Sequence, residues 1–269
     1  MRKPTDEFRP ETVVAVEAVG RGLSVALSGV GAADVRFKGE RDLVTATDIA
    51  VEDAIRDIVA GALAIPVIGE ERGGEAPADG SPSWLVDPIC GTRNFASGTP
   101  LYCVNIALVE DGQVTVGVSG DPSTGEIHVA ERGRGAWGLK DGARRTLTAT
   151  DESRTILIED GRSTGARREW CARFLAGAIR AARWDVRALG TTLSLPYVAA
   201  GRTAAYVLFW ASALHAAAGA LIATEAGAAV SDLDGRPWTI QSDSIIAAAG
   251  PDLHRDLLGL ARSTSNPAS

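Results

Sequence analysis

The sequence predicts a layered α/β fold, and three observations support this class. From about residue 150 onward, apolar runs of strand length alternate with runs of helical periodicity. The first 150 residues combine two amphipathic helical patterns with several strand-length apolar runs. The length of 269 residues allows one large or two modest domains with an ample core. We expect an N-terminal α+β half over residues 1–150, a C-terminal α/β half over 151–262 and a disordered tail over 263–269.

The first elements are two helices separated by a short connection. Apolar residues recur at helical spacing over residues 11–29, which predicts an amphipathic helix. Residues 34–46 have the character of a hairpin or loop. A second helical pattern follows Thr47 and Asp48, and either side chain can act as its N-cap.

Several short apolar runs then predict the strands of the first half. Pro88 should end the run that begins at Trp84, because proline cannot donate to a strand ladder. His128 alternates with apolar neighbours and is expected to face outward. The predicted strands are 65–68, 84–86, 102–109, 114–119 and 126–131.

After residue 150 the alternation of strands and helices predicts a largely parallel or mixed sheet with helices packed on it. The predicted strands are 155–159, 183–188, 203–209 and 244–249, and the predicted helices are 166–180, 191–200, 213–227 and 251–262.

Composition limits the possible partners and the compartment. The formal net charge of −7, without a basic cluster, argues against nucleic acid as a partner. No apolar run approaches the ~18 residues of a membrane span, and the N-terminus lacks the apolar core of a secretory signal. Three widely spaced cysteines (Cys90, Cys103 and Cys171) favour a reducing cytoplasm over a disulfide framework. The richness in Ala, Arg and Gly suggests a bacterial gene.

The stretch SWLVDPICGTRNF, from Ser83 to Phe95, contains the most informative residues. Asp87 stands at the end of an apolar run, and Gly91 and Thr92 form a turn directly after it. A carboxylate at a strand end can bind a divalent cation, while such a turn offers N–H groups and a hydroxyl to a phosphate. A tight turn capped by Asp87 is the purely structural alternative.

Read together with DLVTATD (Asp42 to Asp48) and IGEE (Ile68 to Glu71), this stretch resembles the inositol monophosphatase family of metal-dependent phosphatases. The runs from Gly190 to Tyr206 and from His215 to Gly227 extend the resemblance over roughly residues 10–250. It implies an αβαβα sandwich, a small-molecule substrate and a homodimer.

The resemblance also implies roles for individual residues. Glu70, Asp87 and the backbone carbonyl of Ile89 match the ligands of one Mg²⁺, and oxygen donors suit such a hard cation. Asp48 and Thr92 match the pair that polarises the attacking water, and Lys38 lies on the loop that brings in a further metal. The residues expected at the substrate are Gly91, Thr92, Thr191, Leu208 and Trp210.

The chain departs from the family pattern at the second metal. Cys90 and His215 stand where the family has two aspartate ligands, so a second Mg²⁺ should bind weakly or not at all. Three interpretations remain open for this pair. The two side chains can bind a softer metal such as Zn²⁺, form a catalytic Cys–His pair, or simply fill the vacated space.

The strand before His215 departs as well. Family members carry an acidic residue there that binds hydroxyl groups, and this chain has Leu208 at that position, followed by Trp210. A wall of this kind favours a less polar metabolite over a polyol phosphate.

Three functional hypotheses follow. The favoured one is an enzyme of small-molecule biosynthesis whose phosphatase site is partly dismantled, with Cys90 and His215 catalysing a non-hydrolytic or altered reaction and Glu70, Asp48 and Thr92 nearby. The first alternative is a phosphomonoesterase that uses one Mg²⁺ at Glu70 and Asp87. The second is a non-catalytic binding protein.

Overall fold

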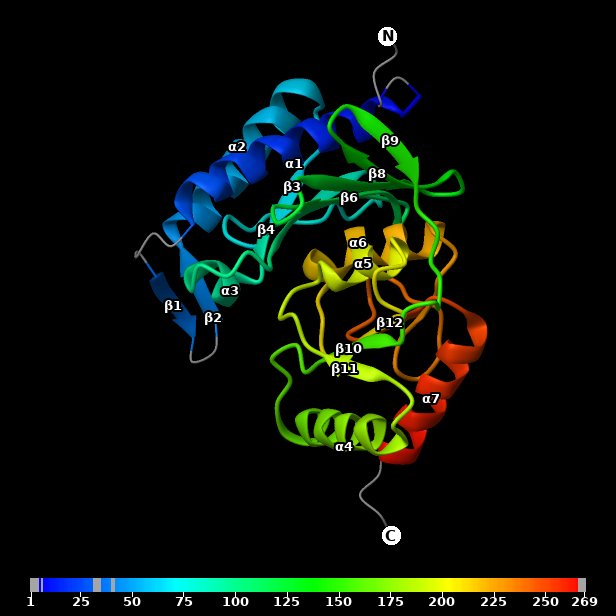
Figure 1. Cartoon of the computed structure of the whole chain (residues 1–269). Helices are drawn as coiled ribbons and strands as arrows, with labels where there is room; N and C mark the ends of the chain where they lie inside the picture. The colour runs from blue at the N-terminus through cyan, green and yellow to red at the C-terminus, as the bar shows by residue number, and fades with distance from the viewer. Residues whose placement is uncertain (1–4, 6, 31–34, 40–41, 266–269) are drawn as a thin grey trace.

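The computed structural model describes residues 5, 7–30, 35–39 and 42–265, and it has five layers in the order α, β, α, β, α (Figure 1). This arrangement confirms the predicted layered α/β class. At the edge of the molecule, β1 (Val35–Gly39) and β2 (Asp42–Thr45) form a small antiparallel hairpin. The predicted role of Lys38 falls on a side chain outside the described ones.

The first sheet has seven strands in the order β3-β4-β5-β6-β7-β8-β9. Only the β3–β4 pair is parallel, and the other neighbours are antiparallel. The strands are β3 (Val67–Gly69), β4 (Ser83–Cys90), β5 (Cys103–Glu110), β6 (Gln113–Asp121), β7 (Glu126–Glu131), β8 (Gly135–Lys140) and β9 (Ala143–Thr146).

Two helices, α1 (Pro10–Gly29) and α2 (Ala46–Ala62), cover the outer face of this sheet (Figure 1). By length and composition α1 is apolar enough to cross a membrane, but Val19 and Leu23 on it pack into the same core as Ile55 of α2. The apolar stripe of α1 is therefore explained by contact with the protein itself.

The N-cap of α2 differs from the prediction. Thr45, rather than Thr47 or Asp48, is the N-cap, and Asp48 is the third residue of the helix. The Thr45 side chain accepts from the Asp48 N–H, while the Asp48 carboxylate accepts from the Thr45 N–H at 2.8 Å. This reciprocal capping box fixes one oxygen of Asp48 and leaves the other for the site described below.

The middle layer consists of α5 (Ser194–Ala199) and α6 (Ala213–Glu225), which lie between the two sheets (Figure 1). Residues 216–223 of α6 are buried without a break, because both faces of the helix meet a sheet. The many alanines of α6 keep the helix thin enough for this close approach. Its N-terminal turn, which carries His215, is the part that opens toward a cavity.

The second sheet is mixed, as predicted, with the order β11-β10-β12-β14-β13. Strand β10 pairs in parallel with β11 and β12, while β14 pairs antiparallel with β12 and β13. Helices α4 (Gly165–Ala181) and α7 (Pro251–Ser265) form the last layer. The strands are β10 (Thr155–Glu159), β11 (Asp185–Arg187), β12 (Ala205–Leu208), β13 (Ala229–Ser231) and β14 (Ile245–Ala248).

Three further expectations were wrong in detail. Strand β4 continues through Pro88 to Cys90, because a register shift against β5 between Asp87 and Cys90 removes the need for an N–H at residue 88. His128 is fully buried, because the middle layer covers the second face of the sheet. Helix α7 extends to Ser265, so residues 263–265 of the predicted disordered tail are helical and 266–269 lie outside the described residues.

Candidate functional site

A cavity of about 450 Å³ opens between the two halves of the molecule. It lies at the carboxyl ends of β4, β10 and β12 and beside the first turn of α6. The five residues predicted to contact the substrate all line it: Gly91, Thr92, Thr191, Leu208 and Trp210. Glu70, Ile89, Cys90 and His215 line it too. Side chains far apart in the sequence are thus brought to one concave site of a size that suits a small molecule.

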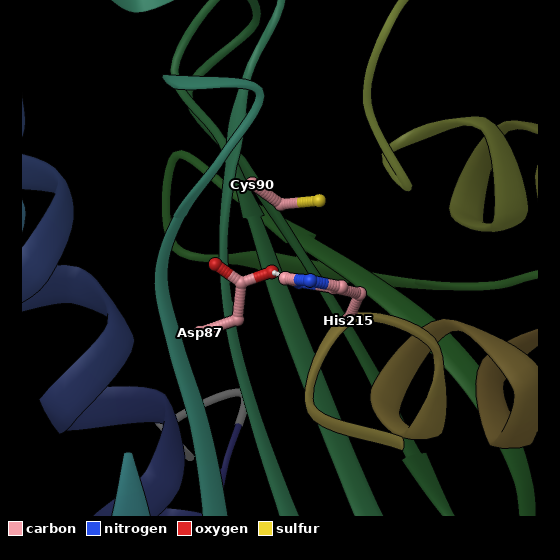
Figure 2. A group of neighbouring side chains, drawn as sticks. All are labelled: Asp87, Cys90 and His215. Carbon is pink, nitrogen blue, oxygen red and sulfur yellow. Dashed lines mark hydrogen bonds and ion pairs between the residues drawn. The ribbon is translucent and has the colours of Figure 1, made fainter. Parts of the chain in front are cut away.

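Asp87 is the buried acid of this site, and its two oxygens have different environments. Oδ2 lies 2.8 Å from His215 Nδ1, and a dashed line in Figure 2 marks this contact. Oδ1 is buried and has no hydrogen-bond partner among the described residues. Because an unpaired buried carboxylate oxygen costs free energy, this atom points to a cation as its missing partner.

Glu70 enters the site from the loop after β3. Its carboxylate is largely buried and lies 3.9 Å from His215 Nδ1. Burial, together with the charge of Asp87, raises the pKa of Glu70 to about 8. A buried carboxyl group with a raised pKa beside a second carboxylate is typical of a place where a cation binds.

Thr92 connects the turn after β4 to α2. Its hydroxyl lies 3.1 Å from the Ile89 carbonyl oxygen and 3.3 Å from Asp48 Oδ1, and its single proton can go to either. Burial raises the pKa of Asp48, against the hydrogen bonds from Thr45 and Thr92 that lower it. The hydroxyl can therefore accept a hydrogen bond from water while it donates to Asp48.

The donor set of Glu70, Asp87 and the Ile89 carbonyl fits Mg²⁺. All three groups are hard oxygen donors, and the unpaired Oδ1 of Asp87 supplies an atom without another partner in the described part of the chain. Glu70 and Ile89 line the cavity, and Asp87 is buried beside it in contact with the lining residue His215.

The predicted second site has a different donor set. Asp87, Cys90 and His215 each offer one ligand atom, and these atoms lie within 4.8 Å of one another (Figure 2). Cys90 comes from the end of β4, and His215 from the first turn of α6. The thiol and imidazole do not fit a second Mg²⁺, because that ion prefers hard oxygen ligands.

Cys90 is held by the loop that precedes α5. Thr192 donates to the Cys90 sulfur from its hydroxyl at 2.9 Å and from its backbone N–H at 3.4 Å. Cys103 is the cross-strand neighbour of Cys90 on β5. The Cys103 contact, burial and the charge of Asp87 raise the pKa of the Cys90 thiol, so the thiol is neutral in the absence of a cation.

His215 contacts an acidic residue, Asp87, with one ring nitrogen and a basic residue, Arg162, with the other. Burial alone would lower its pKa, but the charge of Asp87 and the hydrogen bonds to Asp87 and Cys90 together outweigh burial, and the pKa is raised. On the far side of the ring, Nε2 lies 3.3 Å from Arg162 Nη2. Asp87, His215 and Arg162 thus form a continuous polar chain across the wall.

Sequence reasoning missed Arg162. It lies on the turn after β10, in a left-handed conformation with φ of 67°, directly after Gly161 with φ of 61°. A Cβ at Gly161 would lie 1.8 Å from the Trp210 carbonyl oxygen, so only glycine allows the turn to pass there. The Arg162 guanidinium stands 5.9 Å from the Trp210 ring centroid. The Asp-Gly pair before Arg162 is the one sequence signal of this turn.

Leu208 and Trp210 make one part of the cavity wall apolar. Leu208 is buried on β12 beside Glu159 of β10, and Trp210 is 38% exposed at the rim. Glu159, which the sequence analysis did not select, accepts from the Leu189 and Gly190 N–H groups at 2.9 and 2.8 Å. Its carboxylate therefore shapes the loop around the cavity.

The chain is similar in sequence and in structure to proteins of one family. The model of the inositol monophosphatase family matches residues 8–266. Inositol-1-monophosphatase ImpA of Mycolicibacterium smegmatis is 35% identical over 246 residues, which are 87% of this chain and 84% of that protein. Inositol-1-monophosphatase SuhB of Mycobacterium tuberculosis is 37% identical over 247 residues, with 88% and 83% covered. The structure of extragenic suppressor protein SuhB from Bartonella henselae has a TM-score of 0.85 at 27% identity, and the match covers 94% of this chain and 99% of that one.

Proposed function

Because the chain belongs to the inositol monophosphatase family, we propose that it hydrolyses phosphomonoesters of a small molecule with the help of one hard divalent cation. The observation that carries this proposal is the convergence of Glu70, Asp87 and the Ile89 carbonyl beside the Thr92 hydroxyl, with Asp87 Oδ1 buried and unpaired among the described residues. Held there, Mg²⁺ would supply positive charge that polarises a phosphate oxygen and makes water a stronger acid.

The residues of the chain position the other reactants. The Thr92 hydroxyl donates a hydrogen bond to Asp48, so its oxygen can accept a hydrogen bond from the attacking water. The N-terminal end of α6, where His215 lines the cavity, would bring the positive end of the helix dipole near the phosphate. Arg162 lines the cavity beside His215 and offers a positively charged hydrogen-bond donor that would stabilise the charge developing on the departing oxygen.

The first test is phosphate release with Mg²⁺ from a broad panel of phosphomonoesters. We expect native protein to turn over at least one ester. Thr92→Val should lower kcat by about 10², because it removes the group that orients the water, and KM should change little. Ser97→Ala, which removes an exposed hydroxyl bound to the Asn94 carbonyl, is the matched control and should behave like native protein. Equal kcat values for Thr92→Val and Ser97→Ala would contradict the proposed role of Thr92.

The substrate should carry an apolar or aromatic part in addition to its phosphate. Leu208 and Trp210 line the cavity where a polyol would need hydrogen-bond partners, and Arg162 lies against the Trp210 ring. The relatives named above are inositol-1-monophosphatases, so the proposal is a shift of substrate within the same reaction class.

Trp210→Ala tests this substrate class. Losing the ring should raise KM for an aryl phosphate by about 5- to 10-fold, which corresponds to the ~1–1.5 kcal/mol of an aromatic contact. KM for inositol 1-phosphate should change by less than about 2-fold, since a polyol gains little from the ring. An equal change in KM for both esters would show that Trp210 does not select the substrate.

A second candidate is the altered, non-hydrolytic reaction on a less polar metabolite. It is supported by the short distance between the Cys90, His215 and Asp87 ligand atoms, which also suits acid–base or nucleophilic chemistry. If the native protein releases no phosphate and the Cys90→Asp/His215→Asp variant does, this candidate replaces hydrolysis. If both proteins are silent and Cys90→Ala leaves the biological role intact, the chain is a binding protein.

A further inference from the structure

We infer that Asp87, Cys90 and His215 form a binding site for one soft or borderline divalent cation of the Zn²⁺ class, in the place where a second Mg²⁺ does not fit. The three ligand atoms come from two separate elements, β4 and α6, and lie within 4.8 Å of one another (Figure 2). One carboxylate oxygen, one sulfur and one imidazole nitrogen make a three-ligand set with the chemistry of zinc sites.

The present contacts leave room for the cation to replace a proton. His215 Nδ1 and Asp87 Oδ2 share one proton across 2.8 Å, with the Cys90 sulfur beside them. A cation between the three atoms would take the place of that proton. Asp87 would then use Oδ2 for this cation and its unpaired Oδ1 for the Mg²⁺ beside Glu70.

The surroundings of Cys90 support a metal-bound thiolate. Two donors from Thr192, the hydroxyl at 2.9 Å and the backbone N–H at 3.4 Å, are directed at the sulfur. Hydrogen bonds of this kind stabilise the negative sulfur of a metal–thiolate bond and fix its orientation. A cysteine that merely filled space would not need two donors on its sulfur.

The site has an open side. Cys90 and His215 both line the cavity of about 450 Å³, so a fourth position would face bound substrate or water. Three protein ligands and one open position are the arrangement of catalytic rather than structural zinc sites. The sequence alone leaves this interpretation open beside a catalytic Cys–His pair and simple packing. A catalytic pair would need a His215 nitrogen to take the thiol proton, but Nδ1 lies 2.8 Å from Asp87 and Nε2 lies 3.3 Å from Arg162 Nη2, so the contacts favour the metal.

Cobalt binding tests the site without any assay of activity. Reduced, metal-free full-length protein is titrated with Co²⁺, and we expect one equivalent to produce a thiolate-to-cobalt charge-transfer band in the near ultraviolet. One equivalent of Zn²⁺ should abolish the band, whereas a large excess of Mg²⁺ should leave it.

Variants then assign the ligands. Cys90→Ser should abolish the band, and His215→Ala should weaken Co²⁺ binding beyond the 10- to 100-fold that losing a second-shell group costs. Cys171→Ser, on α4 outside the cavity lining, should keep the native band, and circular dichroism verifies that each variant is folded. The Cys90→Asp/His215→Asp variant keeps possible ligands but should bind Co²⁺ without the band and gain affinity for Mg²⁺.

Three results would overturn the site: no band from native protein, a band that survives in Cys90→Ser, or displacement of Co²⁺ by Mg²⁺ as readily as by Zn²⁺. A band that Cys103→Ser abolishes while Cys90→Ser keeps it would assign the cation to the cross-strand neighbour and also refute the proposal. Phosphate release without a band would refute this site alone, and a band without phosphate release would refute only the hydrolase.

Discussion

Asp87→Asn should reduce phosphate release at least about 10³-fold, because it removes the only group that faces both predicted cation sites in the described structure. Asparagine has nearly the same shape, and its carbonyl oxygen can still accept from His215. What Asp87→Asn removes is the negative charge that would hold the cations. The kinetic measurement is kcat/KM on the best ester of the panel.

The thermal stability of this variant gives a second readout. In metal-free native protein the Asp87 carboxylate pairs with His215 at 2.8 Å, and the pKa of about 8 leaves Glu70 neutral at pH 7, so Asp87→Asn removes an ion pair and Tm should fall. Added Mg²⁺ should raise Tm of the native protein by mass action and leave Asp87→Asn unchanged. Release within 10-fold of native, or an equal rise in Tm with Mg²⁺, would show that Asp87 does not hold the cation.

The layers and most elements could be predicted from the sequence because local patterns determine them. Helix α1 and the mixed second sheet follow from the apolar spacing of residues 11–29 and from the alternation after residue 150. Short elements were missed because they contain too few residues to show a periodic pattern. Helix α3 (Thr92–Ala96), β9 and β13 are five, four and three residues long, and their conformation depends on neighbours rather than on periodicity.

The buried position of His128 shows where strand alternation stops being informative. The rule of outward-facing polar residues assumes one solvent-exposed face, but α6 packs on β7 from the inner side. His128 therefore lies beside Glu126 at 3.4 Å, and Arg202, from the turn after α5, reaches the same carboxylate at 2.6 Å. Long-range packing of this kind is absent from the local pattern.

The residues of the candidate site also fall into two groups, those that a local motif indicates and those that only long-range packing brings together. Glu70, Asp87 and Thr92 could be chosen because each belongs to a short motif with a chemical reason. The contact of Arg162 with His215 joins residues 53 positions apart in the chain, through a strained turn wedged against Trp210. No spacing rule encodes such a contact, because it depends on how β10, β12 and α6 pack.

Glu52→Ala should be the most destabilising of the changes considered, and it tests how the loop of Glu70 is held. Glu52 of α2 is fully buried, and its carboxylate accepts from the backbone N–H groups of Glu71 at 2.7 Å and Arg72 at 3.1 Å. It also forms an ion pair with Arg56 at 2.8 Å. Gly69 permits this approach, since a Cβ there would lie 2.0 Å from Glu52 Oε1.

Removing the carboxylate leaves Arg56 without its buried partner and two N–H groups without an acceptor. We expect the free energy of unfolding to fall by about 3–5 kcal/mol, as for a broken buried ion pair. The apparent affinity for Mg²⁺ should drop about 10- to 100-fold, because Glu70 loses the support that orients it. Urea denaturation gives the first quantity, and the dependence of phosphate release on Mg²⁺ gives the second.

Asp53→Ala provides the matched control on the adjacent residue of the same helix. Asp53 pairs with Arg72 at 2.7 Å, but both side chains are about half exposed, so the change should cost only ~0–1 kcal/mol and leave the Mg²⁺ dependence unaltered. Glu52→Gln should fall between the two, since the amide still offers one acceptor oxygen. If Glu52→Ala and Asp53→Ala were equally stable, the loop of Glu70 would be held by β3 itself, and the buried carboxylate would need another explanation.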